Sequence, residues 1–263
     1  MAAQQFIKDG QLDAALKALQ DEVRKDASNP KLRTFLFQLL AVQGQWNRAL
    51  TQLNVAGELD AAALPMVQTY REAIQCEALR ADIFAGERAP LIFGEPQDWL
   101  GQLVEALKYD PASEQAEALR AQAFEQAPAT PGSIDGQRFE WLADADQRLG
   151  PVLEAIVNGR YFWIPFMRIA RIEIDPPADL RDAVWTAASF TFTNGASTVG
   201  LIPTRYSGTL EAGDDALKLA RRTDWNGAAG LGQRMFASDS ADYALMDVRS
   251  IEFDAAADAA GHG

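Results

Sequence analysis

The residues best suited to acid–base chemistry are two carboxylates, Asp144 and Asp146, which follow Trp141 and precede Arg148. Two carboxylates this close together could serve as general acid and general base. Without a metal ion or strong burial, such a pair is more typical of a turn cap or of ion pairs with arginine. We therefore expect these two aspartates to have a structural role.

Three other short stretches combine arginine, aspartate and aromatic residues. They are residues 180–182, 203–206 and 223–225. This mixture is typical of the hot spot of a protein interface. It fits equally well an arginine–aspartate network beneath a small barrel. The sequence leaves both interpretations open.

A glycine-rich stretch with Gly227, Gly230 and Gly232 precedes Gln233 and Arg234. A glycine-rich turn can bind phosphate through its backbone N–H groups. This one lacks the preceding strand, the Lys-Ser/Thr pair and the following helix of a P-loop. We expect a β-turn or a bulge here.

Histidine and cysteine are each present once, as His262 and Cys76. Since the one histidine lies in the terminal Gly-His-Gly, we expect neither a His-based catalytic triad nor a His/Cys zinc site. With one cysteine, an internal disulfide is impossible, and Cys76 lies in an apolar helical stretch where we expect it to pack. We expect no cofactor, no metal and no enzymatic activity.

The chain carries 24 basic and 37 acidic residues, a net charge of −13. An acidic surface repels phosphate backbones, so nucleic acid is not an expected partner. No apolar run approaches the length of a membrane-spanning helix, and the first residues lack the basic and apolar regions of a secretory signal. These features predict a cytoplasmic protein that is not inserted in a membrane.

The elements that would position these residues differ between the two halves. In the first half, residues 10–19 and 44–53 resemble each other at a spacing of 34 residues, the period of a tetratricopeptide helix pair. Gly10 and Gly44 are placed for tight turns, and Ala15 and Ala49 for close helix contacts. Chance similarity of two amphipathic helices is the alternative. Residues 1–126 are predicted to be about six antiparallel helices without any strand.

The second half has the signals of a β domain. Residues 127–136 are a linker by composition. Asn158-Gly159 and Asn194-Gly195 each separate β-forming stretches, which predicts two hairpins with positive φ at both turn residues. Residues 137–253 should form a small β-barrel-like or curled-sheet domain, and residues 254–263 a flexible tail. The predicted fold class is α+β.

Several motifs distributed over nearly the whole chain resemble the ImpE/SciE family. They are residues 94–100, 139–151, 158–166, 179–185, 202–206, 222–225 and 232–234. The candidate interaction or family-signature residues in and around them are Trp141, Asp144, Asp146, Arg148, Trp163, Arg181, Asp182, Trp185, Arg205, Tyr206, Trp225, Gln233 and Arg234.

The resemblance implies a cytoplasmic, non-catalytic accessory protein of the bacterial type VI secretion system. Proteins of this family bind an N-terminal helix of the small sheath subunit TssB, and they are linked to the ATPase ClpV, which disassembles contracted sheath. The resemblance provides no active site to carry over, and it does not say which residues contact a partner. A helical array agrees with it, because such an array can hold an amphipathic helix in a groove.

Two alternatives remain. One is a generic helical-repeat scaffold with another client. The other is a small-molecule-binding or enzymatic C-terminal domain that uses its Arg/Asp/Trp cluster. A deep cleft with Asp144, Asp146, Arg181 and Arg205 converging in it would favour the second, whereas a shallow apolar groove would favour a helix-binding adaptor.

Overall fold

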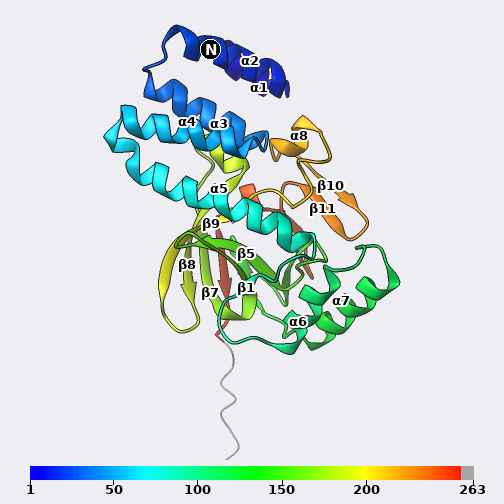
Figure 1. Ribbon diagram of the computed structural model, residues 1–263. Helices are drawn as coiled ribbons and strands as arrows, with labels where there is room; N and C mark the ends of the chain where they lie inside the picture. Colours follow the sequence, from blue (N-terminus) through cyan, green and yellow to red (C-terminus); the bar gives the residue numbers. More distant parts are fainter. Residues whose placement is uncertain (256–263) are drawn as a thin grey trace, which may run out of the picture.

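The computed structural model describes residues 1–255, so the expected tail and His262 lie almost wholly outside the described part. Its first half is mainly helical: the first five helices are stacked above a large sheet, and the last two lie lower, beside it (Figure 1). The helices are α1 (Ala2–Lys8), α2 (Leu12–Lys25), α3 (Pro30–Val42), α4 (Trp46–Leu59), α5 (Leu64–Phe84), α6 (Asp98–Ala106) and α7 (Glu114–Gln126), with a 3-10 turn η1 (Ala61–Ala63) before α5.

The two turns that the 34-residue spacing singles out have the same local geometry. Gly10 and Gly44 both have φ of +70°. In each turn the glycine N–H bonds to the carbonyl three residues earlier, and the next N–H to the carbonyl five residues earlier. These bonds satisfy carbonyls that a helix end would otherwise leave free. Ala15 and Ala49 are fully buried, as close helix contact requires. The tetratricopeptide-like character of the array stays a prediction.

The prediction of a strand-free first half was wrong at one place. Strand β1 (Leu91–Ile92) pairs in parallel with β6 (Arg160–Pro165) at the edge of the sheet. The adjacent Phe93 stacks on Phe192, with ring centroids 4.2 Å apart. An apolar run between two prolines cannot continue a helix, and pairing with an open edge both satisfies its backbone and buries its side chains.

The expected linker, residues 127–136, also contains a strand. Strand β2 (Gly132–Ile134) pairs with β14 (Ser250–Phe253) and with β3 (Gln137–Phe139). An added Cβ at Gly132 would collide with the backbone of Glu252, so only glycine permits this close pairing. The linker is therefore tied into the sheet at its C-terminal end.

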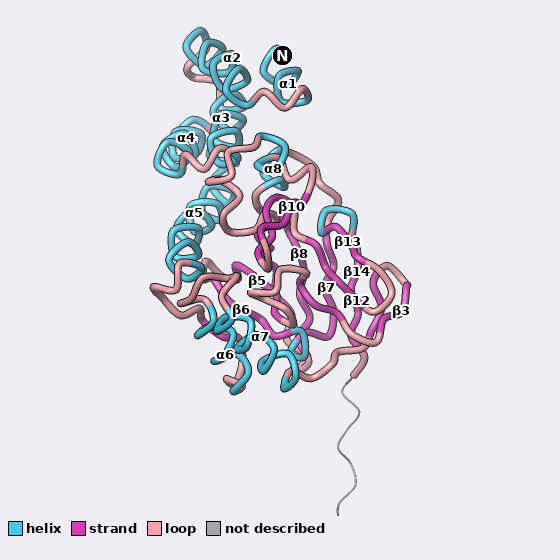
Figure 2. The backbone as a smooth tube through the Cα atoms, turned by 90° about the vertical axis from the view of Figure 1, so that its right-hand side faces the viewer, coloured by secondary structure: helices cyan, strands magenta, loops and turns pink. Residues whose placement is uncertain are grey.

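The large sheet is open and has nine strands in the order β1-β6-β5-β9-β8-β7-β14-β2-β3; all of them except β1 come from the second half. The second half also contains a smaller sheet in the order β13-β12-β4 and a separate hairpin β10-β11 (Figure 2). The remaining strands are β4 (Leu142–Asp144), β5 (Val152–Val157), β7 (Ile169–Ile174), β8 (Trp185–Phe192), β9 (Ser197–Pro203), β10 (Thr223–Asn226), β11 (Ala229–Gly232), β12 (Met235–Ser238) and β13 (Asp242–Ala244). Short helical turns are η2 (Phe166–Arg168), η3 (Leu180–Ala183), α8 (Asp215–Lys218) and η4 (Leu245–Asp247).

The α+β class is confirmed, but the barrel alternative is wrong. Within residues 1–255 the outermost strands β1 and β3 do not pair with each other, so the sheet does not close. The edge strand β1 comes from the helical half, and the expected linker contributes β2, the strand next to the other edge. Neither segment could be assigned to the sheet by composition.

One predicted hairpin turn is confirmed and the other is wrong. Asn158 and Gly159 have φ of +49° and +71°, as a two-residue turn requires. In the β8–β9 hairpin the N–H of Gly195 bonds to Phe192, so Thr193 and Asn194 are the central residues. Gly195 follows them with φ of +82°. This longer loop needs only one left-handed residue, which glycine supplies.

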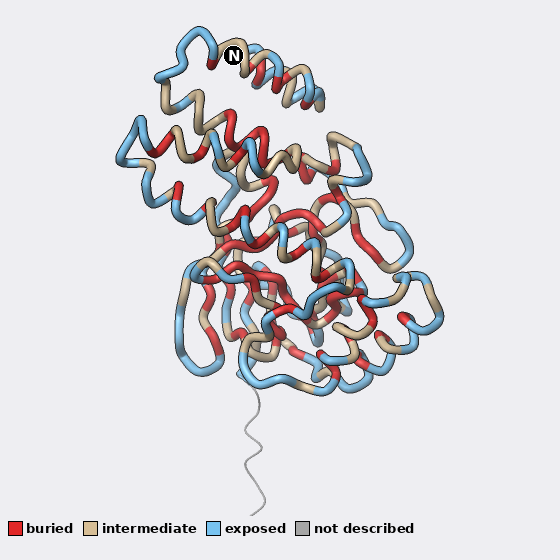
Figure 3. Tube along the Cα trace, viewed as in Figure 1, coloured by how far each residue is buried: buried red, intermediate tan, exposed pale blue. Residues whose placement is uncertain are grey.

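In the large sheet, strand β5 is buried on both faces, because all six of its residues are buried. Strands β7, β8, β9 and β14 contain exposed residues, so one face of the sheet is partly open to solvent there (Figure 3). Val152 and Ile156 belong to the apolar core shared with the helices. Leu153, Ala155 and Val157 belong to a second core, which lies between the large sheet and the smaller one. By this alternation the residue between them, Glu154, faces the helices.

Candidate functional site: a buried arginine–carboxylate network and two grooves

Glu154 is the centre of a network of buried charges between α5 and the sheet. The Nε of Arg80 donates to its carboxylate at 2.5 Å, and the phenol of Tyr161 donates at 2.5 Å. Arg234 forms a further ion pair with it. Burial alone would raise the pKa of Glu154, but the positive charges of Arg80 and Arg234 lower this pKa to about 2. Glu154 is therefore ionised and fully paired.

Arg234 also binds Asp144, so its fully buried guanidinium joins two carboxylates. Its Nε donates to the carbonyl of Pro203 at 2.9 Å. Asp144 accepts a second bond, 3.0 Å long, from the hydroxyl of Tyr206. Burial raises the pKa of Asp144 to about 7, although Arg234 opposes this shift. The network thus ties β4, β5 and β12 together.

Asp146 and Arg148 form a separate pair, 2.5 Å between Oδ2 and Nη2. Asp146 also accepts from the backbone N–H of Gly230, which holds the β10–β11 hairpin in place. The guanidinium of Arg148 lies 4.8 Å from the ring centroid of Phe84 on α5. The prediction that these aspartates pair with arginine and stabilise a turn is confirmed, as is the β-turn at Gly227, where φ is +59°.

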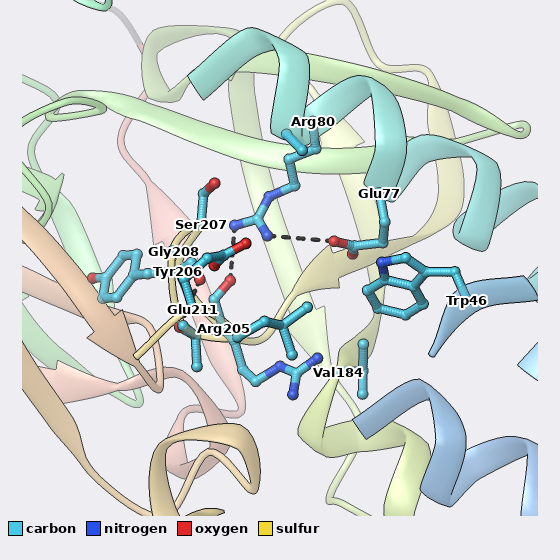
Figure 4. A pocket seen from close by; sticks show the side chains of 12 residues that line it. Trp46, Glu77, Arg80, Val184, Arg205, Tyr206, Ser207, Gly208 and Glu211 are labelled. Carbon is cyan, nitrogen blue, oxygen red and sulfur yellow. Dashed lines mark hydrogen bonds and ion pairs between the residues drawn. The ribbon is translucent and has the colours of Figure 1, made fainter. Parts of the chain in front are cut away.

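Arg205 is buried, and no carboxylate in residues 1–255 bonds to its guanidinium. Its Nη1 donates to the carbonyls of Val42, at 2.6 Å, and Lys218, at 2.7 Å, which lie at the C-terminal ends of α3 and α8. The partial negative charge of helix ends stabilises a cation there. Burial nevertheless lowers the pKa of Arg205 to about 10. Beside it lies a small cavity of about 90 Å³, where Arg80 and Glu77 face each other (Figure 4).

The remaining predicted residues form hydrogen bonds at separate places in the fold. Arg181 pairs with Asp179, and its guanidinium lies 4.8 Å from the ring centroid of Tyr70. Asp182 accepts the N–H groups of Ala178 and Asp179. The other contacts run from Trp163 to Tyr161, from Trp185 to Glu77, and from Gln233 to Ala220.

The arrangement does not form the cleft that catalysis by these residues would need. Asp144 and Asp146 are buried and bound, and Arg181 lies elsewhere against Tyr70. Arg205 faces helix ends rather than the aspartates. No group of side chains suited to a metal ion occurs in residues 1–255. In the same part of the chain, no helix has the length and apolar character to cross a membrane.

The central residues Arg80 and Glu154 were missed by sequence analysis. A signal was present, because Glu154 is the one charged residue in an otherwise apolar strand. A charge in such a strand must have a buried partner. The partner lies 74 residues earlier in the chain, which no local pattern indicates. Cys76, by contrast, is buried as expected, and burial raises the pKa of its thiol to about 11.

Several open grooves lie at the surface of residues 1–255, and two of them are lined by different parts of the chain. We name the larger one, of about 840 Å³, the array groove. It is lined by Met1, Gln4, Ile7, Lys8, Pro30, Lys31, Thr34, Phe35, Gln38, Asp60, Ala63, Pro177, Ala178, Asp179 and Leu180. The second, the Trp141 groove, has about 470 Å³ and lies between residues 124–130 and β4. Trp141 is 41% exposed in it. Trp225 is 48% exposed and packs on Tyr206 instead.

The fold and the site define an α+β protein with a helical part and a sheet part. Its buried ion pairs join the two parts, and its surface carries open grooves. Its family follows from sequence comparison. Residues 136–252 match the family model described as "ImpE protein". The chain is also 54% identical over 257 residues to the "Type VI secretion system accessory component TagJ" of Pseudomonas aeruginosa, which covers 97% of this chain and 92% of that protein. The chain belongs to the ImpE family.

A solved structure supports the fold independently. A crystallised protein from Vibrio parahaemolyticus superimposes with a TM-score of 0.86, at 25% sequence identity. The match covers 97% of this chain and 98% of that one. The helical array and the sheet therefore occur together in a relative with a much changed sequence.

Proposed function

We propose that this chain is a non-catalytic accessory component of a type VI secretion system. The observation that carries the proposal is its 54% identity, over 97% of the chain, to a protein named as such a component. The site geometry supports it, because the carboxylates that could act as acid and base are bound by arginines within the fold. A cytoplasmic location, where the sheath lies, follows from this proposal.

We further propose that the array groove binds the N-terminal helix of the sheath subunit TssB. An amphipathic helix docks by placing one apolar stripe in a groove. The array groove offers Ile7, Phe35 and Leu180 as partly buried apolar surface. Met1, at 56% exposure, extends this surface at the rim. Ile7, Phe35 and Leu180 come from α1, α3 and the start of η3, so the array and the sheet domain together form the site.

The charge of the chain is distributed unevenly around this groove. Residues 1–59 contain seven basic and six acidic side chains, whereas the whole chain has a net charge of −13. Residues 60–263 therefore account for the acidic field. Such a field speeds the approach of a partner segment with basic residues beside its apolar stripe, and salt screens it. The groove is lined by two basic residues, Lys8 and Lys31, and by the acidic Asp60. It can therefore contact both acidic and basic residues of a partner.

The affinity should be moderate. An isolated helix of about 15–20 residues is marginal in water, so binding must order it. That ordering reduces the net free energy, and we expect a dissociation constant of about 1 μM with fast release. Fast release suits an accessory factor that must leave when the sheath is recycled, and a link to the recycling ATPase ClpV is part of the proposal.

The test is calorimetry with the TssB N-terminal peptide at low and high salt. The proposal expects a dissociation constant of about 1 μM at low salt and weaker binding as salt rises. A scrambled peptide of the same composition is the control, because it keeps the charge but not the apolar stripe. Absence of heat well above micromolar concentration, together with absence of sheath protein in a pull-down, would leave the generic scaffold as the better account.

A further inference from the structure

One segment of the second half, residues 205–222, contacts both turns of the array; we name it the clamp segment. At the first turn, Nη2 of Arg221 donates to the carbonyl of Ile7 at 2.7 Å, and Nη1 donates to that of Lys8 at 2.9 Å. Asp215 accepts the N–H of Leu12 at 2.9 Å. The end of α1 and the start of α2 are thus both bound by the same segment.

The clamp segment repeats this contact at the second turn, 34 residues later. Arg205 donates to the carbonyl of Val42 at the end of α3. Leu210 packs directly on Gly44, where an added Cβ would collide with its side chain. Each array turn therefore receives one arginine from the clamp segment, placed on the last carbonyls of the first helix of the pair.

The carbonyls of Lys8 and Val42 receive a partner from these contacts, whereas that of Ile7 already accepts from Gly10. The last carbonyls and first N–H groups of a helix have no partner within it, and a cation near its C-terminus is favourable. Helix α1 depends on such help more than α3 does, because it has only seven residues. A helix this short is not stable alone in water.

We propose that the clamp segment sets the width of the array groove, with Arg221 and Asp215 as positioning residues for its α1 wall. Ile7 and Lys8, whose carbonyls Arg221 holds, are themselves groove residues. The α1 wall of the groove is therefore held in position by a segment more than 200 residues away in sequence. This inference rests on the proposed function, because it concerns the groove assigned to the TssB helix.

The neighbouring arginine provides a matched control. Arg222 is also exposed, but it pairs with Asp214 and Asp224 and makes no bond to the array. Arg221→Ala and Arg222→Ala remove the same atoms from adjacent positions. Since both side chains lie at the surface, neither variant should change the midpoint of denaturant unfolding appreciably.

The experiment measures two quantities on each full-length variant: amide hydrogen exchange in residues 2–12, and affinity for the TssB N-terminal peptide. For Arg221→Ala we expect exchange about tenfold faster in α1 and affinity about five- to tenfold weaker, since two bonds to a charged donor are lost. Arg222→Ala should leave both within about twofold. Asp215→Ala should have the same effects as Arg221→Ala. Asp215→Asn keeps an acceptor for the Leu12 N–H, so it should have wild-type exchange in α1 and wild-type affinity.

The two measurements separate the clamp from the proposed function. If α1 exchanges at the wild-type rate in Arg221→Ala, the clamp is overturned whatever the peptide does. If exchange accelerates but affinity is unchanged, α1 is held by the clamp yet does not form the binding wall, and the positioning role is overturned. If wild-type protein binds no peptide, the proposed function fails, while faster exchange in Arg221→Ala alone would still support the hold on α1.

Discussion

In the buried network, Arg80, Arg234 and Glu154 are almost completely removed from water and each is bound by an opposite charge. In the array groove, the charges of Lys8 and Lys31 lie exposed at the rim of an apolar hollow. The first arrangement cannot be opened without leaving a charge unpaired, so it resists change. The second leaves part of its apolar surface uncovered, and this is the surface that the proposed partner would bury. The comparison separates residues that maintain the fold from residues available for binding.

The largest effect should come from breaking the network. Arg234→Ala leaves Asp144 and Glu154 without their shared partner, and we expect a loss of about 3–5 kcal/mol in the free energy of unfolding. Denaturant unfolding measures this. The control is Arg138→Ala, which removes an exposed pair with Asp254 and should change stability by less than about 1 kcal/mol. Equal losses of stability in the two variants would mean that the buried network does not stabilise the fold more than an exposed ion pair does.

The second effect is a dependence on pH. Because burial raises the pKa of Asp144 to about 7, the folded protein retains a proton that the unfolded chain releases between about pH 4 and 7. The free energy of unfolding should therefore fall by about 2–4 kcal/mol as pH rises through that range. The lowered pKa of Glu154, about 2, adds stability that is lost as pH falls below about 4.5.

Unfolding curves at a series of pH values test this dependence. Asp144→Asn should lack the fall between pH 4 and 7, because no proton is released at that position. The same slope in Asp144→Asn and wild type would show that Asp144 is ionised throughout the range and paired like Glu154.

A third prediction concerns the interior of the array. Ala49 is fully buried at the contact between helices, so Ala49→Trp should lower stability by about 1–3 kcal/mol through overpacking. Ala121→Trp on the exposed face of α7 is the control. A melting temperature of Ala49→Trp equal to that of wild type would mean that the close contact does not exist.

The smallest effect distinguishes the two grooves. Phe35→Ala removes an apolar side chain from the array groove and should weaken binding of the TssB peptide about tenfold. Trp141→Ala removes an exposed aromatic side chain from the other groove and should leave affinity within about twofold. The reverse ranking would move the binding site to the Trp141 groove.

What the sequence could predict depended on how local the determining contacts are. The turns at Gly10 and Gly44 and the Asn158-Gly159 hairpin rest on neighbouring residues, and all are present. The array was foreseen for the same reason. Within the candidate site, the pairing of Asp146 with Arg148 was also predicted, because the two are close in the chain.

The rest depended on pairing over long distances. Strand β1 is stabilised by an edge 71 residues later, and Glu154 by Arg80 from the other half. Nor did any local pattern show that Arg205 and Arg221 reach back to the array turns. Trp141 and Trp185 are the same residue type, yet Trp141 is exposed in a groove and Trp185 is fully buried. Composition cannot separate them, because the difference is made by which surfaces meet in the fold.

The central claim, that the array groove holds the sheath helix, is tested most directly by amide hydrogen exchange of the full chain with and without the TssB N-terminal peptide. The account predicts slower exchange on binding in α1, in the first turns of α3, and in residues 60–63 and 177–180, with no change in residues 124–151. Protection confined to residues 124–151, or none at saturating peptide, would contradict it.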